Sequence, residues 1–558
     1  MGSQRVSDPE HTASAEPEGA DAHTPEGVGP AGSAAVVAEM RTTRQRRRLG
    51  DTQWGELAYR VYTTGFFVFV VVIMVSGAIG DRPASQSAIE RAGEVGPAWA
   101  GLLLAVVLLA ATRSGSRGGP LALEEADVSH LLLSPADRSR TLRRPVAGIL
   151  GYGVFTGLVV LALTGSLLSQ RFPGGTSEFV WSGALFGAVL AAVALGAALF
   201  TASRLVPAWV VAGIAGILVL WAVADLADRA PMAPTTFAGR LLFWPMEGAA
   251  SGSAGLVWVV VALALCAMGV HFIGGLSIEA ARRRTQLVGQ LRFAVTQQDL
   301  RSVVLLRRQL ASEIPRRRRW FPWPRSRRPG LAVLDRDMQS ISHWPTVRIL
   351  RVFGLALVAA LATRGVFSGT TPLVVVAGIA AFVAATDATE GLSQEVDHPA
   401  LLESYPHEEG RIMLEHLAAP VITLMFMGSA ALLVVYLLDP SAQVLRVGAI
   451  TVVCASLTAV AGSAVSTVSQ VDTGTDNAMA ITPEVAGPRL VMRTAWPPLL
   501  ATVGFLPALL AANASAGSDP AGLAATAALP VFALVGIVAG WVRLRTRIHQ
   551  ALAESMPG

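Results

Sequence analysis

The chain has 558 residues, of which 52% are hydrophobic and 15% charged, and its formal net charge is +5. Soluble proteins carry about 25% charged residues, so the composition excludes an ordinary soluble domain and favours a polytopic membrane protein. The sequence contains no Lys, so all 44 basic residues are Arg. These Arg residues cluster beside apolar stretches, as expected for residues that fix membrane topology, and they give no reason to invoke nucleic acid.

The first fifty residues differ in composition from the rest of the chain. Residues 1–50 are rich in Pro, Gly, Ala, Ser and acidic side chains, so we expect a disordered cytosolic N-terminal tail without a cleavable signal peptide. Its basic end, residues 41–48, is expected to hold the N-terminus inside. Residues 51–59 then predict a short interfacial helix.

Apolar stretches of about 20 residues, the length that a helix needs to cross a bilayer, recur along the remaining sequence. They predict an all-α integral membrane protein with about twelve transmembrane helices, divided into a first six-helix half over 51–276 and a second over 331–545. The Arg-rich loops fall on one side, which places both termini in the cytosol, including a short tail over 546–558. The predicted spans are 58–79, 95–112, 146–168, 179–203, 205–225, 255–276, 347–368, 371–388, 418–438, 444–469, 491–512 and 520–543.

A basic segment, 277–330, links the two halves. Apolar residues recur at helical spacing over 279–295 and 299–310, and an Arg run with Trp320 and Trp323 follows. One interpretation is a pair of basic amphipathic helices lying on the lipid headgroups. The alternative is a contact surface for a soluble partner.

The second half opens with an amphipathic pattern. Leu331, Leu334, Met338 and Ile341 lie on one helical face, so residues 331–344 predict a helix in the membrane plane before the seventh span.

A short cytosolic segment occurs twice, between the second and third spans of each half. The first copy, 127–135, runs from Asp127 to Pro135, and the second, 397–406, runs from Asp397 to Pro406. Each copy carries an acidic residue, then a Leu pair, then a Pro. Two equivalent cytosolic segments predict two docking surfaces for cytosolic partners.

The predicted outer loop after the fifth span, 229–246, is rich in Pro and aromatic residues. It could form short helices that dip into the outer leaflet, or remain an interfacial loop anchored by Phe243 and Trp244. In the first case it would act as an outer gate. The candidate gate residues are Phe237, Leu241, Phe243 and Trp244.

Signals of catalysis and of metal binding are missing from the sequence. A chain without Lys has no Walker A lysine, and it shows neither a metal-binding helix nor a nucleophile elbow. Cys266 and Cys454 lie in apolar spans without metal-ligand spacing. Asp225, Arg364 and Asp387 fall near predicted span ends, so an ion-coupled carrier with a carboxylate in mid-membrane is not favoured. We therefore expect no enzyme activity, no metal and no cofactor held by this chain.

Taken together, the six spans per half, the interfacial helix, the repeated cytosolic segment and the outer aromatic loop resemble the type-2 ABC exporter permeases. Residues 124–140 are similar to the acidic, apolar, Pro and Arg stretch of such bacterial permeases, and residues 298–310 resemble an actinobacterial group of fused permeases. The resemblance covers the architecture of most of 50–550 through short motifs. The chain departs from the family in carrying both halves, and the second copy is followed by His and Glu rather than by Arg.

The resemblance implies a permease of a bacterial cytoplasmic membrane whose separate ATPase subunits dock on two cytosolic helices, the first docking segment (127–140) and the second docking segment (397–411). The Leu pairs would fill an apolar groove on each ATPase, and the charged residues would orient the contact. ATP would be bound by the ATPase subunits. The alternative is an orphan membrane protein that scaffolds or regulates an envelope complex. The docking residues implied are Asp127, Leu131, Leu132, Pro135, Arg138, Asp397, Leu401, Leu402, Pro406, Glu408 and Arg411.

Overall fold

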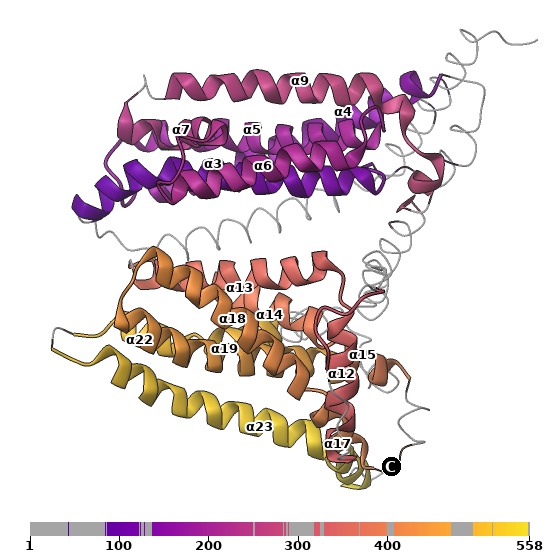
Figure 1. The fold of residues 1–558 in the computed structure, drawn as a ribbon, viewed down its shortest axis with the longest axis vertical. Helices are drawn as coiled ribbons and strands as arrows, with labels where there is room; N and C mark the ends of the chain where they lie inside the picture. The colour runs from indigo at the N-terminus through magenta and orange to yellow at the C-terminus, as the bar shows by residue number, and fades with distance from the viewer. Residues whose placement is uncertain are drawn as a thin grey trace, which may run out of the picture. The chain divides into compact units, whose positions relative to one another are not determined.

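All regular secondary structure in the described part of the chain is helical (Figure 1). The structure is a computed structural model. It describes Glu39, Thr43 and residues 84, 86–121, 123, 128, 137–248, 252–282, 284–285, 288, 317–323, 329–367, 369–398, 405, 407–469, 495–515 and 517–555.

Nine helices in these ranges are long and apolar enough to cross a membrane, and there are up to eleven if each of two bent helix pairs forms one span. One pair is α14 (Leu373–Ala388) with α15 (Glu390–Asp397), bent by 58°. The other is Ala495–Val503 with α22 (Leu506–Ala512), bent by 52°. The all-α membrane class is thus confirmed. The predicted span 58–79 and the interfacial helix 51–59 lie outside the described residues, so the count of twelve remains a prediction.

The chain forms two compact units, Met1–Tyr62 with Glu90–Ala162 and Glu178–Gly289, and Thr63–Ile89 with Leu163–Ser177 and Gln290–Gly558. The break between Gly289 and Gln290 falls within the predicted linker 277–330. The helices mainly in the first unit are α3 (Gln86–Ser116), α4 (Arg138–Leu168), α5 (Thr176–Ala202), α6 (Ala208–Leu226), α7 (Pro234–Glu247) and α9 (Val257–Phe272). Those of the second unit are α12 (Ala332–Ser342), α13 (Thr346–Phe367), α14, α15, α17 (Glu409–Glu415), α18 (Ala418–Leu438), α19 (Ala442–Val468), α22 and α23 (Pro520–Ser555).

The core of the first unit lies between α3 and α5. Leu104 of α3 packs in one cluster with Phe186 and Val193 of α5, all fully or almost fully buried. Helix α4 approaches α5 at Gly157 and Gly187, where any side chain would overlap the facing backbone. Small residues at such crossings let membrane helices pack without help from water exclusion. Arg204, with φ of 57°, ends α5, so the predicted fourth and fifth spans are separate helices.

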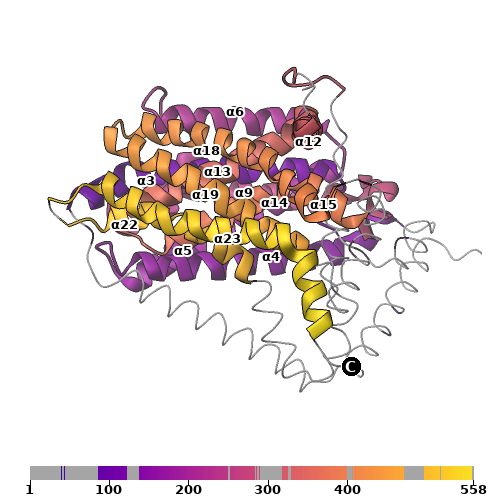
Figure 2. The same ribbon diagram turned by 90° about the horizontal axis from the view of Figure 1, so that it is seen from below.

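The second unit is organised around α19. This helix contacts α14, α18, α22 and α23, and its buried side chains are mostly small. Helix α23 is longer than the predicted span 520–543, because it continues without a break to Ser555 through most of the segment expected to be a tail. In Figure 2 the last turns of α23 project beyond the other helices of this unit.

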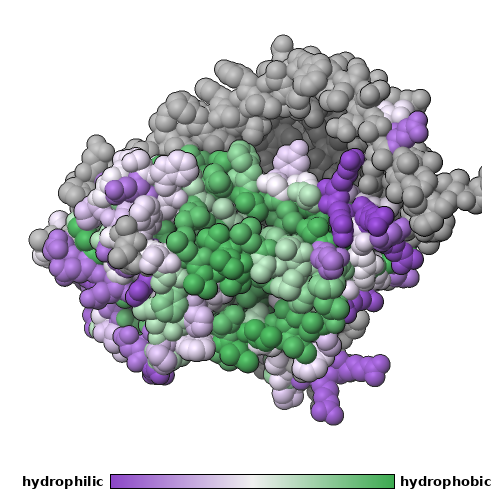
Figure 3. Space-filling view, turned by 90° about the horizontal axis from the view of Figure 1, so that it is seen from above, coloured by the Kyte–Doolittle hydropathy of each residue, from purple (hydrophilic) through white to green (hydrophobic). Residues whose placement is uncertain are grey.

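The outer surfaces of the long helices are apolar. Helix α4 exposes Tyr152 and Phe155, α6 exposes Trp209 and Leu220, and α9 exposes Val260. Figure 3 shows a hydrophobic surface with hydrophilic residues at both of its ends. Such a band suits contact with lipid acyl chains rather than with water.

Candidate functional site

Helix α12 follows the amphipathic pattern expected for residues 331–344. Met338 and Ile341 are buried and Leu334 is half-buried, as predicted, whereas Leu331 precedes the helix and is exposed. In Figure 1, α12 runs across one end of the long helices of its unit, beside α15 and α17. The apolar face of α12 therefore packs on the bundle. The same helix also carries two buried carboxylates, Asp335 and Asp337, which the sequence did not lead us to expect.

Helices α15 and α17 flank the second docking segment on its two sides. Helix α15 ends at Asp397, the first residue of that segment, and α17 begins at Glu409. The bend between α14 and α15 turns the chain out of the direction of the spans, whereas α17 leads almost directly into α18. Both ends of the segment are thus attached to predicted membrane spans.

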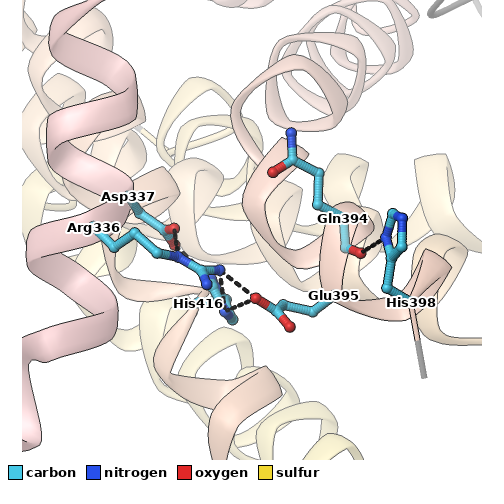
Figure 4. Close-up of polar contacts among 6 residues, drawn as sticks. All are labelled: Arg336, Asp337, Gln394, Glu395, His398 and His416. Atoms are coloured by element: carbon cyan, nitrogen blue, oxygen red, sulfur yellow. Dashed lines mark hydrogen bonds and ion pairs between the residues drawn. The ribbon is translucent and has the colours of Figure 1, made fainter. Parts of the chain in front are cut away.

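A charged cluster, made of Arg336, Asp337, Glu395 and His416, joins these elements, and all of its members except Arg336 are buried (Figure 4). His416 is only 1% exposed, and its Nδ1 lies 2.6 Å from Oδ2 of Asp337. Because an ionised carboxylate only accepts hydrogen bonds, Nδ1 is the donor. Gly391 leaves room for this pair, since a Cβ there would come within 2.8 Å of Asp337 Oδ1.

Arg336 completes the cluster from the other side. Its Nη2 donates to Oε1 of Glu395 and lies 3.3 Å from Nε2 of His416. A guanidinium has no acceptor, so the arrangement favours the His416 tautomer whose single proton is on Nδ1. Burial lowers the pKa of Arg336, but the hydrogen bond and charge of Glu395 and the charge of Asp337 outweigh this, and the pKa is raised overall.

Glu395 is the member of the cluster whose burial costs the most free energy. Its side chain is 3% exposed, and its second oxygen, Oε2, is buried without a hydrogen-bond partner within the described part of the chain. A buried carboxylate is tolerated when it is paired, as Glu395 is with Arg336. The four side chains therefore hold α12, α15 and the α17–α18 junction as one piece.

A second set of ion pairs ties the same end of α13 to α14 and α15. Arg348 donates to Glu390 and to the backbone carbonyl of Asp387, and Arg351 donates to the Asp387 carboxylate. The Arg348 guanidinium also lies 4.2 Å from the ring centroid of Trp344. The expectation that Asp387 lies near a span end is confirmed.

The charged cluster positions the elements that it joins. Within the described part of the chain, His416 contacts two acidic side chains and an arginine. Within the described residues, no group of three His, Cys, Asp or Glu side chains is arranged to hold a metal ion.

The predicted docking residues are only partly within the described residues. Asp127, Leu131, Leu132, Pro135, Leu401, Leu402 and Pro406 lie outside them, as do most of the linker and of the tail 1–50. Of the others, Asp397 ends α15, and Glu408 and Arg411 lie at the start of α17. Glu408 pairs with Arg547 of α23, and Arg411 pairs with Glu415, so these two docking residues already have partners within the chain.

The first docking segment ends at a capped helix. Arg138 is the first residue of α4, and Asp137 precedes it. The Asp137 carboxylate accepts hydrogen bonds from the Ser139 hydroxyl, 2.8 Å away, and from the Ser139 backbone N–H, 2.9 Å away. These bonds, with the charges of Arg140 and Arg143, lower the pKa of Asp137. The carboxylate therefore stabilises the start of α4 above the pKa of a free Asp, and this contribution is lost as the pH falls.

The predicted outer loop contains one helix, α7. Leu241 is buried in the core of the first unit, and Phe237 and Phe243 pack against that core. Trp244 is half-buried, and its Nε1 is buried without a partner within the described part of the chain. Residues 234–247 are thus helical, whereas the position of this helix in the outer leaflet and a gate made of these four side chains remain predictions.

Asp225 fixes the start of α7. Its Oδ2 accepts a hydrogen bond from the Thr236 hydroxyl, 2.6 Å away, and from the Ala233 backbone N–H, 2.8 Å away. Replacing Asp225 with Ala should destabilise this helix start by about 1–2 kcal/mol, because both donors lose their acceptor. Hydrogen exchange over 234–247 should become faster in D225A than in D225N, which keeps an acceptor oxygen. Equal exchange in the two variants would contradict this role.

The charged cluster was missed by sequence reasoning. Arg336 and Asp337 lie within the amphipathic pattern of α12, where charges usually belong to the solvated face, and His416 lies eighty residues along the chain from Arg336. A scan against protein-family models, a search of curated proteins and a search of solved structures each found no match to the chain.

Proposed function

We propose that the chain is the transmembrane permease subunit of an ABC exporter, which moves a substrate across a bacterial cytoplasmic membrane. Separate ATPase subunits would dock on it and hydrolyse ATP. The observation that carries the proposal is the anchoring of the second docking segment. Its flanking helices are joined to α12 by two buried side chains, Glu395 at the end of α15, which pairs with Arg336, and His416 directly after α17, which contacts Asp337.

This anchoring suits a part that receives a mechanical load. Glu395 lies two residues before the second docking segment, and His416 lies just after it. A displacement of the second docking segment by a docked ATPase would therefore move α12, the C-terminal end of α14 and the start of α18 together. A loop lying loosely on lipid headgroups would not need three buried ionisable side chains at its base.

The order of elements also supports the proposal. An amphipathic helix, α12, precedes α13, and two spans separate it from the second docking segment. In the first unit α7 lies between α6 and α9, at the position of the outer loop of the exporter family. Within this proposal the chain has twelve spans and both termini are cytosolic.

The test is co-purification of an ATPase with the full chain. We expect an ATPase subunit co-expressed from a neighbouring reading frame to purify with the wild-type chain and to hydrolyse ATP. Replacing Leu401 and Leu402 with Asp should abolish co-purification, because two charges cannot enter an apolar groove. Ser340→Asp, at an exposed position of α12, is the control for an added acid and should leave co-purification unchanged.

Two results would overturn the proposal. One is that no ATPase purifies with the wild-type chain, and the other is that the L401D/L402D variant retains it. Recovery of other envelope proteins with the wild-type chain, in place of an ATPase, would favour a scaffold.

A further inference from the structure

The second unit contains a cavity of about 280 Å³ between α13, α18 and α19. Ala384 of α14, Leu424 of α18 and Ala459 of α19 line it, and Phe505 also contributes to the lining. The cavity lies away from the charged cluster and is built by different residues.

The walls of the cavity are mostly apolar, although the hydroxyl residues Thr363, Thr451 and Ser456 also line it. Ala356, Ala360, Gly428 and Gly448 line it, together with Val and Leu side chains of α18 and α19. An apolar cavity of ~150 Å³ already holds benzene, and ligand pockets begin at about 300 Å³. The space is therefore large enough for a ligand, and its walls favour an apolar one, since water needs two or more polar partners.

The lining of the cavity extends over much of α19. Along α19 its lining runs from Ser441 to Ala459. At 1.5 Å per residue this is about 27 Å, close to the hydrocarbon thickness of a bilayer. A volume of about 280 Å³ along that length has room for an extended alkyl chain.

One end of the cavity is polar. Arg364 near the end of α13 and Asp439 just after α18 lie 3.8 Å apart there, with Ser441 and Gln443 beside them. Both charged side chains are partly exposed, 35% for Arg364 and 54% for Asp439. A guanidinium is well suited to a phosphate group, and a carboxylate can accept from an ammonium or hydroxyl group.

We propose that this cavity is a binding site for a membrane phospholipid. One acyl chain lies in the apolar shaft, the phosphate contacts Arg364, and the donor group of the head contacts Asp439. The polar end coincides with the ends of the candidate spans α13 and α18, where lipid headgroups are expected if these helices cross the membrane. This proposal concerns binding alone and does not depend on the ATPase.

The test is lipid retention by the purified full chain, measured by native mass spectrometry after phosphatidylethanolamine is added and excess lipid is washed away. We expect one tightly held lipid. Ala360→Leu fills the shaft and should abolish retention, whereas Ala449→Leu, at an exposed position of α19, should leave it unchanged. Equal retention by these two variants would overturn the proposal.

The headgroup contact has its own test. Arg364→Gln should weaken binding roughly tenfold, because a charge-assisted hydrogen bond is lost. Arg446→Gln, near the same end of α19 but outside the cavity lining, should not weaken it. The wild-type chain should hold diacylglycerol, which lacks the phosphate, less tightly than phosphatidylethanolamine. The R364Q variant should hold the two lipids equally tightly. Tight retention of diacylglycerol by the wild-type chain would overturn the assignment of the phosphate to Arg364.

Discussion

Replacing His416 with Ala is expected to lower the free energy of unfolding by about 1.5–3 kcal/mol, the contribution of a hydrogen bond to a charged group. The imidazole fills a site that is 99% shielded from solvent and donates to Asp337 over 2.6 Å. Without it, Asp337 keeps a buried charge with no hydrogen bond from α17–α18. Thermal unfolding of the purified chain, followed by tryptophan fluorescence, should show the loss.

The control for this prediction is His398, which Figure 4 shows beside the cluster. His398 is exposed and its Nδ1 contacts only the backbone carbonyl of Gln394 at 2.8 Å, so H398A should change stability by about 0.5 kcal/mol or less. A double variant, H416A with D337A, should be less destabilised than the sum of the two single variants, because the two residues form one interaction. Strict additivity would show that they act independently.

Replacing Gly410 with Ala is expected to destabilise the second unit by about 1–3 kcal/mol, as overpacking does in a well-packed core. A Cβ at Gly410 would overlap the backbone carbonyl of Arg543, so α17 would have to move away from α23. The backbone of a helix cannot rotate aside as a flexible side chain can. The decrease in the free energy of unfolding can be measured by unfolding the purified chain in detergent.

Gly354 provides the matched control, because it is also a helical glycine and a Cβ there meets nothing within 4 Å. G354A should be neutral or stabilising by up to about 1 kcal/mol, the helix propensity gained over Gly. If G410A and G354A behaved alike, the contact of α17 with α23 would be of no energetic importance.

The sequence was informative about long apolar helices and amphipathic faces. Spans such as 444–469 were predictable because about 20 apolar residues in a row have few stable alternatives to a buried or membrane helix. Helix α12 was predictable because Leu334, Met338 and Ile341 recur at helical spacing. Helix ends were less predictable. Nothing in the composition of 546–555 distinguishes a helical extension from a tail. Contacts with α17, which the sequence does not reveal, help to hold the C-terminal part of α23.

The charged cluster could not be predicted, because its members come from three elements far apart in the sequence. A charged residue in an amphipathic helix normally faces solvent, so the sequence around Asp337 does not indicate that it is buried. Its burial depends on α15 and α17, which cover it. The space for its carboxylate comes from Gly391, whose role is visible only in three dimensions. For the same reason, the capping of α7 by Asp225 was not expected, although the position of Asp225 near a span end was.

Helix α23 has two different kinds of support, because its span packs along α19 and α22 whereas its C-terminal part is in contact with α17. At Arg543, Gly410 of α17 rests against the backbone of α23. At 1.5 Å per residue the helix extends about 18 Å beyond this contact to Ser555. A force applied to these last turns would therefore first load the contact with α17, and the packing on α19 and α22 would resist movement of the span.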